Sequence, residues 1–311
     1  MRYRISIFIF ILSLFAFSFT KPETISKIDL GKKLFFDTIL SENYTKSCAS
    51  CHIPEYGFAD TVAFSVGVHH RKGKRNAPSI NDLADRPLLF YDGRATSLEN
   101  QVHFPIEDIN EMNLPIHEAV KRLNKSKAYQ KLFMEAFGEA PNRKNLEIAI
   151  AEFERTLQTI NTPFDKFMND DSTAINASAQ RGREIFMGTK AKCFDCHFSP
   201  DFTGDEFKNI GLYDGKKYND VGRFAITKNK HDIGKFKVPG LRNVANTAPY
   251  MHNGMFKTLR EVIDYYDNLY AVVKQPINLD STLEKPLLLT EQEKIDIESF
   301  LQSLSNIKKQ H

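Results

Sequence analysis

The chain of 311 residues contains no tryptophan, and all four of its cysteines lie in two short motifs. Apolar and polar residues do not alternate over any length, which argues against a fold built mainly of β-strands. Low-complexity linkers are also absent. The 42 basic residues are nearly balanced by 39 acidic ones, so there is no surplus of positive charge of the kind that binds nucleic acid. These absences favour a globular, mainly α protein.

Only the N-terminus carries a long apolar run. Arg2 and Arg4 precede an unbroken apolar stretch at residues 5–17, and small and polar residues follow it. This order is typical of a secretory signal peptide, which we place at residues 1–20. A retained membrane anchor is the alternative, because the cleavage signal is weak. No other segment approaches 18 continuous apolar residues, so we expect the rest of the chain to be soluble.

The four cysteines belong to two copies of Cys-x-x-Cys-His, the attachment sequence of c-type haem. In this motif the two thiols bind the porphyrin and the histidine becomes the proximal iron ligand. Zinc knuckles and thioredoxin-like pairs also contain Cys-x-x-Cys, but two complete copies with no cysteine left over favour haem. Export to the periplasm agrees, since bacteria attach c-type haem outside the cytoplasm. The sequence predicts two covalent haem c groups, a first on Cys48, Cys51 and His52 and a second on Cys193, Cys196 and His197.

The surroundings of the two motifs repeat. Residues 31–36 precede the first motif and residues 182–187 the second, and each segment is typical of a short helix ending in bulky apolar residues. Two cytochrome c-like units in tandem explain the repeat most simply. We expect haem domains at residues 21–170 and 171–311, divided in the polar stretch 169–176, which breaks helical periodicity.

Apolar residues at helical spacing predict three further helices. One contains Leu146, Ala149, Ile150, Phe153 and Leu157, with the polar residues Glu147, Glu152, Glu154 and Arg155 between them. A weaker pattern covers residues 117–137, and a final helix begins at Thr290 and reaches Leu304. Long loops at residues 58–92 and 201–249 are left to wrap the haems. The predicted fold class is mainly α, with two tandem cytochrome c-like haem domains.

Several short motifs follow each haem site. After the first come Arg-Asn-Ala-Pro-Ser at 75–79, Tyr-Asp-Gly-Arg at 91–94 and Gln101 with Glu111; after the second come segments 236–243, 247–254 and 258–262. In order and spacing they resemble those of the bacterial di-haem cytochrome c peroxidases and their MauG-type relatives, over about residues 28–304. The resemblance implies that the first haem reduces hydrogen peroxide and that the second collects electrons from a small cytochrome c or cupredoxin. It also suggests a homodimer.

The resemblance assigns roles to three residues near the first haem. In the family a glutamine and a glutamate ten residues apart line the distal side, and Gln101 and Glu111 have that separation. Glu111 is the candidate acid and base, and Gln101 would orient the peroxide by a hydrogen bond. Arg94 would stabilise developing charge or bind a haem propionate. Taken singly, each of these residue types is more often a solvated surface side chain.

The family also holds a calcium ion between the haems, through an asparagine side chain and two backbone carbonyls. Asn76, Thr247 and Pro249 match those positions. Their oxygens are suitable hard ligands for calcium. Asn and Thr-x-Pro also make ordinary turns, which is the alternative reading of the same residues.

The distal ligand of the first haem departs from the better-known family members. They carry a histidine there, whereas this chain has Val68, with His69 and His70 beside it. We favour an open site, because the Gly-Val sequence resembles family members that lack the ligand. Either histidine would ligate if the loop shifted, although adjacent loop histidines are commonly only solvated.

Two more departures concern the second haem and the space between the haems. Tyr266 stands where many members have a distal methionine, as in MauG-type enzymes, and a tyrosine ligand lowers the haem potential. Tyr265 is its rival, and two such tyrosines can simply belong to a core. Met251 and Met255 are expected to pack at the haem edge. Tyr91 replaces the tryptophan that usually mediates electron transfer, so exchange between the haems is expected to be slower or pH-dependent.

Three functions remain open from the sequence. The leading one is a peroxidase, which converts hydrogen peroxide, two electrons and two protons into two waters. The second is a MauG-like oxidase that modifies a partner protein; Tyr266 favours it and Tyr91 weakens it. The third is an electron carrier without catalysis, against which the pair Gln101 and Glu111 argues, because a carrier has no use for a distal acid.

Overall fold

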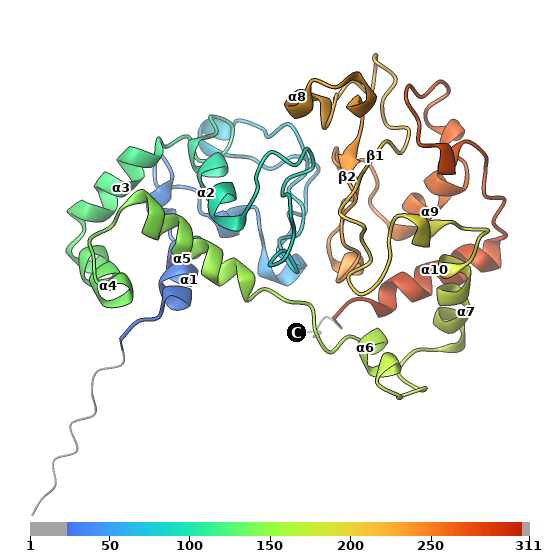
Figure 1. Ribbon diagram of the computed structural model, residues 1–311, viewed down its shortest axis with the longest axis horizontal. Coiled ribbons are helices and arrows are strands. Elements are labelled where there is room, and N and C mark those ends of the chain that lie inside the picture. Colours follow the sequence, from blue (N-terminus) through green and yellow to red (C-terminus); the bar gives the residue numbers. More distant parts are fainter. Residues whose placement is uncertain (1–23, 307–311) are drawn as a thin grey trace, which may run out of the picture.

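The chain forms two helical lobes in the computed structural model, which describes residues 24–306 (Figure 1). The predicted signal peptide lies outside these residues. Within the described part, strands are limited to the antiparallel pair β1 (Phe207–Lys208) and β2 (Phe236–Lys237). No helix of residues 24–306 is long and apolar enough to cross a bilayer. The mainly α fold class is confirmed.

The first lobe surrounds the first Cys-x-x-Cys-His motif. Its helices are α1 (Lys27–Phe36), α2 (Leu98–Glu107), α3 (Ile116–Lys125), α4 (Lys127–Phe137) and α5 (Arg143–Arg155). The single helix predicted at residues 117–137 is wrong, because Ser126 divides it. The backbone N–H of Ser126 closes α3 on the carbonyl of Leu123, and its hydroxyl caps α4 by accepting from the N–H of Tyr129.

The second lobe contains α6 (Pro163–Met168), α7 (Ala177–Met187), α8 (Phe224–Thr227), α9 (Leu259–Asp267) and α10 (Glu291–Ser303). The final helix begins as predicted: Thr290 is its N-cap, and the side chains of Thr290 and Glu293 each accept the other's backbone N–H. Helix α6 precedes the predicted domain boundary, yet Phe164 packs in the core of the second lobe. The chain therefore passes from the first lobe to the second before α6 begins.

Both lobes are built around the same helix crossing. A Cβ added at Gly31 of α1 would lie 1.8 Å from the carbonyl oxygen of Ala149 in α5, and one at Gly182 of α7 would lie 1.8 Å from that of Asp296 in α10. Only glycine permits so close an approach of two backbones. Ala149 and Asp296 therefore occupy equivalent positions in the two lobes. Each haem motif follows the glycine-containing helix of its own crossing.

Ion pairs join the lobes across their facing loops. Arg86 donates to Asp201 at 2.5 Å and to Asp205 at 2.9 Å. Arg75 donates to Asp220 through two nitrogens, at 2.7 and 2.8 Å. Such charge-assisted hydrogen bonds are the stronger kind, and here each arginine of the first lobe holds carboxylates of the second. The long loops are thus fixed against one another rather than free.

Candidate haem sites

One cavity of about 910 Å³ runs between the lobes and reaches both Cys-x-x-Cys-His motifs. All four cysteines line it as free thiols. Burial raises the pKa of Cys51 to about 11 and that of Cys193 to about 12, so these thiols are not poised as nucleophiles. Among residues 24–306, no group of three or more His, Cys, Asp or Glu side chains could bind a metal ion.

The two histidines of the motifs are held in the same way. The Nδ1 atom of His52 lies 3.0 Å from the carbonyl oxygen of Phe58, and that of His197 lies 2.9 Å from the carbonyl oxygen of Phe202. A carbonyl only accepts, so each Nδ1 must donate and each Nε2 keeps its lone pair. Burial lowers the pKa of both histidines, which keeps them neutral. These are the properties of an iron ligand.

The cavity also carries groups suited to haem propionates. The guanidinium Nε of Arg242 is buried without a hydrogen-bond partner in the described part of the chain. Lys46, Lys192 and Arg75 line the same cavity. Nη1 of this guanidinium already donates to Asp165 at 2.5 Å, and Nε lies 3.8 Å from a carboxylate oxygen of Asp201, so only Nε is left for a further acceptor. The volume, the free thiols, the oriented histidines and this donor fit two haem c groups.

Glu111 reaches the cavity from the loop after α2. Its backbone carbonyl accepts from the N–H of Val68 at 2.8 Å, which fixes the loop. No described residue makes a hydrogen bond to its carboxyl. Burial raises the pKa of Glu111 to about 7, the nearby Asp108 raises it further, and Arg94 opposes them. A carboxyl with a pKa near neutrality suits an acid and base.

Gln101 and Arg94 line the same end of the cavity. The amide of Gln101, on α2, has no hydrogen-bond partner within residues 24–306, so it is available to a ligand. Arg94 is fixed instead: its guanidinium donates to the carboxylate of Asp92 at 3.0 Å and lies 3.6 Å from the ring centre of Phe90. The structure thus brings Arg94, Gln101 and Glu111 to one cavity, with the arginine held rigidly.

Neither loop histidine points into this cavity. The Nε2 atom of His69 lies 2.8 Å from a carboxylate oxygen of Glu42 on the outer surface, and His70 is exposed. Val68 is buried beside the distal loop. The preceding Gly67 is required there, since a Cβ would lie 2.1 Å from the carbonyl oxygen of Asn110. In this arrangement neither His69 nor His70 lines the first haem site.

The two adjacent tyrosines of α9 differ in environment. Tyr266 lines the cavity near the second motif, where burial, then Cys196 and Cys193, raise its pKa. Tyr265 faces the other way, and its hydroxyl donates to the carbonyl of Ile210 at 2.6 Å. Met251 lines the cavity, whereas Met255 packs in a side cluster. Of these side chains, Tyr266 is the oxygen donor that faces the second haem site.

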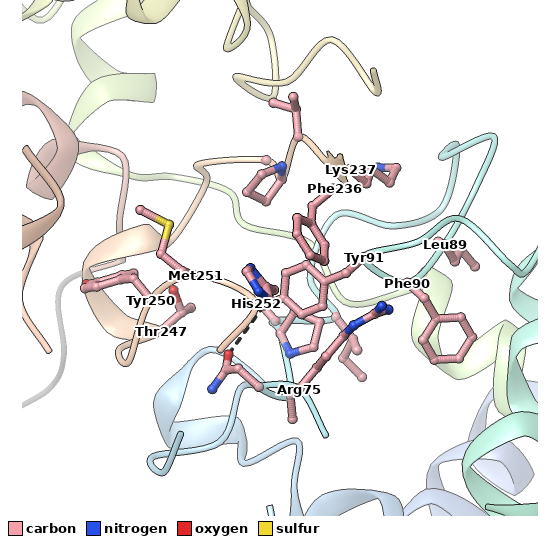
Figure 2. Close-up of a pocket in the computed structure, with 18 of the residues that line it drawn as sticks. Arg75, Leu89, Phe90, Tyr91, Phe236, Lys237, Thr247, Tyr250, Met251 and His252 are labelled. Atoms are coloured by element: carbon pink, nitrogen blue, oxygen red, sulfur yellow. Dashed lines mark hydrogen bonds between the residues drawn. The ribbon is translucent and has the colours of Figure 1, made fainter. Parts of the chain in front are cut away.

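Tyr91 lies beside Phe236 and His252, two side chains of the second lobe (Figure 2). The rings of Phe236 and His252 are stacked, and the edge of His252 meets Tyr91 with ring centres 6.5 Å apart. The Tyr91 hydroxyl is 3.5 Å from the Asn76 side-chain oxygen, a weak contact. Burial raises the pKa of Tyr91 well above its ordinary value. The phenol therefore stays protonated at neutral pH.

The three residues matched to calcium lie along this cavity. The Asn76 amide nitrogen donates to the carbonyl of Val62 at 3.1 Å, which directs its oxygen inward. The carbonyl oxygens of Thr247 and Pro249 accept no hydrogen bond from residues 24–306. Oxygen donors without partners are compatible with a hard cation.

Two cavity residues had no role in the sequence analysis. His252 lies within a recognised motif, but nothing in a single sequence indicates its stacking on Phe236. Glu154 was placed among the polar residues of its helix, and that placement is wrong: it is 6% exposed and lines the cavity. Its spacing of one helical turn from the buried Ile150 is the signal that could have revealed it.

Comparison with known proteins decides the family. The model of the di-haem cytochrome c peroxidases matches residues 25–173. The methylamine utilization protein MauG of Methylorubrum extorquens is 39% identical over 91% of this chain and 79% of its own length. The chain belongs to the di-haem cytochrome c peroxidase and MauG family. It is an oxidoreductase of this peroxidase family, which implies two haem c groups.

Relatives of both types are found within the family. Cytochrome c551 peroxidase of Pseudomonas aeruginosa is 34% identical over 80% of this chain and 73% of its own length. Among solved structures, a MauG-like protein associated with microbial copper homeostasis superposes with a TM-score of 0.83 at 32% identity, covering 91% of this chain and 90% of that one. Membership therefore supports peroxidase chemistry without choosing between the two types.

Proposed function

We propose that this protein reduces hydrogen peroxide to water at the first haem, with electrons that enter from a small cytochrome c or cupredoxin at the second. The observation that carries the proposal is the unpartnered carboxyl of Glu111, which faces the cavity beside Gln101 and Arg94. The reaction combines H2O2, two electrons and two protons into two waters. Haem c, when bound, supplies a redox-active iron that exchanges electrons with peroxide.

Glu111 moves the proton in this proposal. Its carboxylate takes a proton from one oxygen of hydrogen peroxide and returns it to the other, which then leaves as water. The pKa of Glu111, raised to about 7 by burial, lets the same group accept and give a proton near neutral pH. A solvated glutamate with an ordinary pKa would be a much weaker acid catalyst.

Gln101 orients the peroxide, and Arg94 stabilises the negative charge that develops on it. The free amide of Gln101 donates a hydrogen bond to peroxide and fixes its direction relative to Glu111. Arg94 is held by Asp92 and by the ring of Phe90, so its charge is in place before the substrate arrives. A fixed positive charge favours an intermediate in which negative charge develops on oxygen.

The remaining ligands complete the proposal. His52 and His197 would hold the irons from the proximal side, through the Nε2 atoms that their Nδ1 hydrogen bonds leave free. Tyr266 would hold the second iron from its distal side. Tyr91 would lie on the electron path between the two haems.

The test is peroxide consumption by the purified holoprotein with a reduced small cytochrome c or cupredoxin. The Glu111→Gln variant keeps the size of the side chain and removes the base, so we expect a loss of about 10²- to 10⁴-fold in rate. Glu118→Gln, at an exposed site on α3, is the matched control and should retain the rate. A wild-type holoprotein that consumes no peroxide with any such donor would refute the proposal.

A MauG-like oxidation of a partner protein is the second candidate. Tyr266 favours it, because this tyrosine lines the cavity at the position where many peroxidases of the family have a methionine. Mass spectrometry of co-purified proteins before and after addition of peroxide would separate the two. A mass change confined to one partner supports the oxidase, and unchanged partners with rapid peroxide loss support the peroxidase.

Four further properties complete the proposal: export to the periplasm, two haem domains with α6 packed in the second, a homodimer, and a calcium ion at Asn76, Thr247 and Pro249. The unpartnered carbonyl oxygens of Thr247 and Pro249 support the calcium ion. Metal analysis of the holoprotein before and after chelation tests it, and sedimentation tests the dimer. A protein that never contains calcium, or one that sediments as a monomer, would remove the respective property.

A further inference from the structure

Helix α5 places a second carboxyl in the wall of the first haem cavity. Glu154 is 6% exposed and lines the cavity one turn after Ile150. No described residue forms a hydrogen bond or ion pair with its carboxyl. The next residue, Arg155, points away and pairs with Glu99 at 2.5 Å and Glu152 at 3.0 Å. A buried carboxyl without a partner is costly, so a position that keeps one calls for a reason.

The second lobe offers an internal comparison. Because Ala149 and Asp296 are equivalent in the two helix crossings, Glu154 of α5 corresponds to Leu301 of α10. Both residues are 6% exposed, and both line the cavity beside their own haem motif. A leucine thus fills this position at the second haem. Packing alone does not require a carboxyl there, so Glu154 supplies something that the first haem site has and the second lacks.

The surroundings of Glu154 favour its protonated form. Burial raises the pKa of Glu154 to about 8, the neighbouring Glu99 of α2 raises it slightly, and Arg155 lowers it. The face of α1 that packs on α5 is apolar. The charge of Glu154 is felt at Cys48, as is that of Glu111, so both carboxyls act on the edge where the first haem is attached. Cys48 itself carries no charge once it is a thioether.

We propose that Glu154 is a redox-linked acid of the first haem: its carboxyl binds one proton when this haem gains an electron and releases the proton when the electron leaves. The electron comes from the donor protein and the proton from hydronium in the solvent; one O–H bond of hydronium breaks, which leaves water, and one O–H bond forms on the carboxyl. A reduced haem has one positive charge fewer, so it holds a nearby carboxylate less strongly in the ionised form. The inference needs two haem c groups but not peroxide as substrate.

The test is the reduction potential of the first haem in the holoprotein as a function of pH, with the haems distinguished by their spectra. Wild type should lose about 59 mV per pH unit where the coupling acts, a tenfold change in the equilibrium constant for one electron. Glu154→Gln and Glu154→Leu should abolish this slope. Glu152→Gln, on the exposed side of the same helix, is the matched control and should keep it.

The second lobe allows the reverse experiment. Leu301→Glu places the carboxyl at the second haem and should give that haem a pH-dependent potential. Infrared difference spectra between reduced and oxidised wild-type protein should show a protonated carboxyl that appears on reduction. Labelling glutamate with ¹³C should shift this band, which excludes the haem propionates, and the band should persist in Glu111→Gln.

The outcomes separate clearly. A wild-type slope that disappears in Glu154→Gln, with the infrared band, supports the redox-linked acid. An unchanged slope in that variant, or no slope and no labelled band in wild type, overturns it. Each of these results is independent of peroxide turnover. A failed peroxidase test therefore does not overturn the redox-linked acid, and a reduction potential that does not change with pH does not overturn the peroxidase proposal.

Discussion

The imidazole ring of His252 lies flat on the phenyl ring of Phe236, with ring centres 3.8 Å apart and an angle of 12° between the planes. The pair fills the space beside Tyr91 (Figure 2). The backbone carbonyl of His252 also accepts from the N–H of Asn76 at 2.7 Å, which ties the stack to the first lobe. Burial lowers the pKa of His252 to about 4, so the ring is neutral at physiological pH.

Replacing His252 tests whether this stack supports electron exchange between the haems. His252→Ala should slow the exchange after rapid mixing with a reductant, and it should cost about 0.5–1.5 kcal/mol beyond the lost buried area. His252→Phe preserves an aromatic ring and should stay near wild type. Because the imidazole is already neutral, its titration should add no step to the rate between pH 5 and 8; such a step that vanished in His252→Phe would contradict this account.

The pH dependence of peroxide reaction should follow Glu111. Its pKa is raised to about 7, so the carboxylate that accepts a proton from peroxide is scarce below that value and abundant above it. The second-order rate constant should therefore fall about tenfold per unit below pH 7 and level off above it. Stopped-flow mixing with peroxide measures this. If Glu111→Gln keeps the same profile, another group is responsible.

The two tyrosines of α9 should respond differently to loss of the hydroxyl. Tyr266→Phe should change the absorption and paramagnetic resonance spectra of the second haem, since Tyr266 lines its cavity. Tyr265→Phe should leave those spectra alone and cost about 1 kcal/mol of stability, the value of its hydrogen bond to Ile210. The reverse pattern of spectra would assign the ligand to Tyr265.

The helix crossings should not tolerate a methyl group. Gly31→Ala and Gly182→Ala each place a Cβ 1.8 Å from a backbone oxygen, which cannot move independently of its helix. Each should lower the free energy of unfolding by about 1–3 kcal/mol or more, as measured in urea. Gly73→Ala is the control, because its Cβ would meet nothing nearer than 3.6 Å. Equal stability of all three variants would refute the crossing geometry.

Asp296 should stabilise the second lobe in a pH-dependent way. It accepts from Arg181 at 2.8 Å and from Ser178 at 2.6 Å, and the hydrogen bonds of Arg181 are the largest cause that lowers its pKa to about 2. Asp296→Asn should cost about 1.5 kcal/mol at pH 7, near the low end for a charged pair because Arg181 is half exposed.

The sign of this effect follows from the lowered pKa. The unfolded carboxyl binds its proton near pH 4, and the folded one only near pH 2, so the stabilisation is complete above pH 4 and disappears as the pH falls through 2. Urea unfolding of wild type and Asp296→Asn should therefore converge in acid. A difference that persists well below pH 2 would mean that packing, rather than charge, is responsible.

The sequence was sufficient where chemistry depends on local spacing. Covalent attachment to a porphyrin needs two thiols and a histidine within five residues, so the pentapeptides at 48–52 and 193–197 predict the haem sites directly. The cap at Thr290 is equally local, and the structure confirms it. The spacing of apolar residues around Ile150 is also a local pattern, and it predicts the helix that the structure shows there as α5.

Features that depend on distant segments were not accessible. The spacing of Glu154 from Ile150 places it on the apolar face of α5, but the cavity that this face lines is built from distant segments of both lobes, so its role could not be seen in the sequence. The division at Ser126 was missed because an apolar period continued across it. Likewise, the choice between Tyr265 and Tyr266 depends on the carbonyl of Ile210, a partner far away in the sequence.

The cavity shared by the two lobes has a consequence for how the protein is made. The thiols of both motifs open into an interior that Arg86 and Arg75 close by pairing with carboxylates of the other lobe. We therefore expect haem to be attached to both motifs before the two lobes dock.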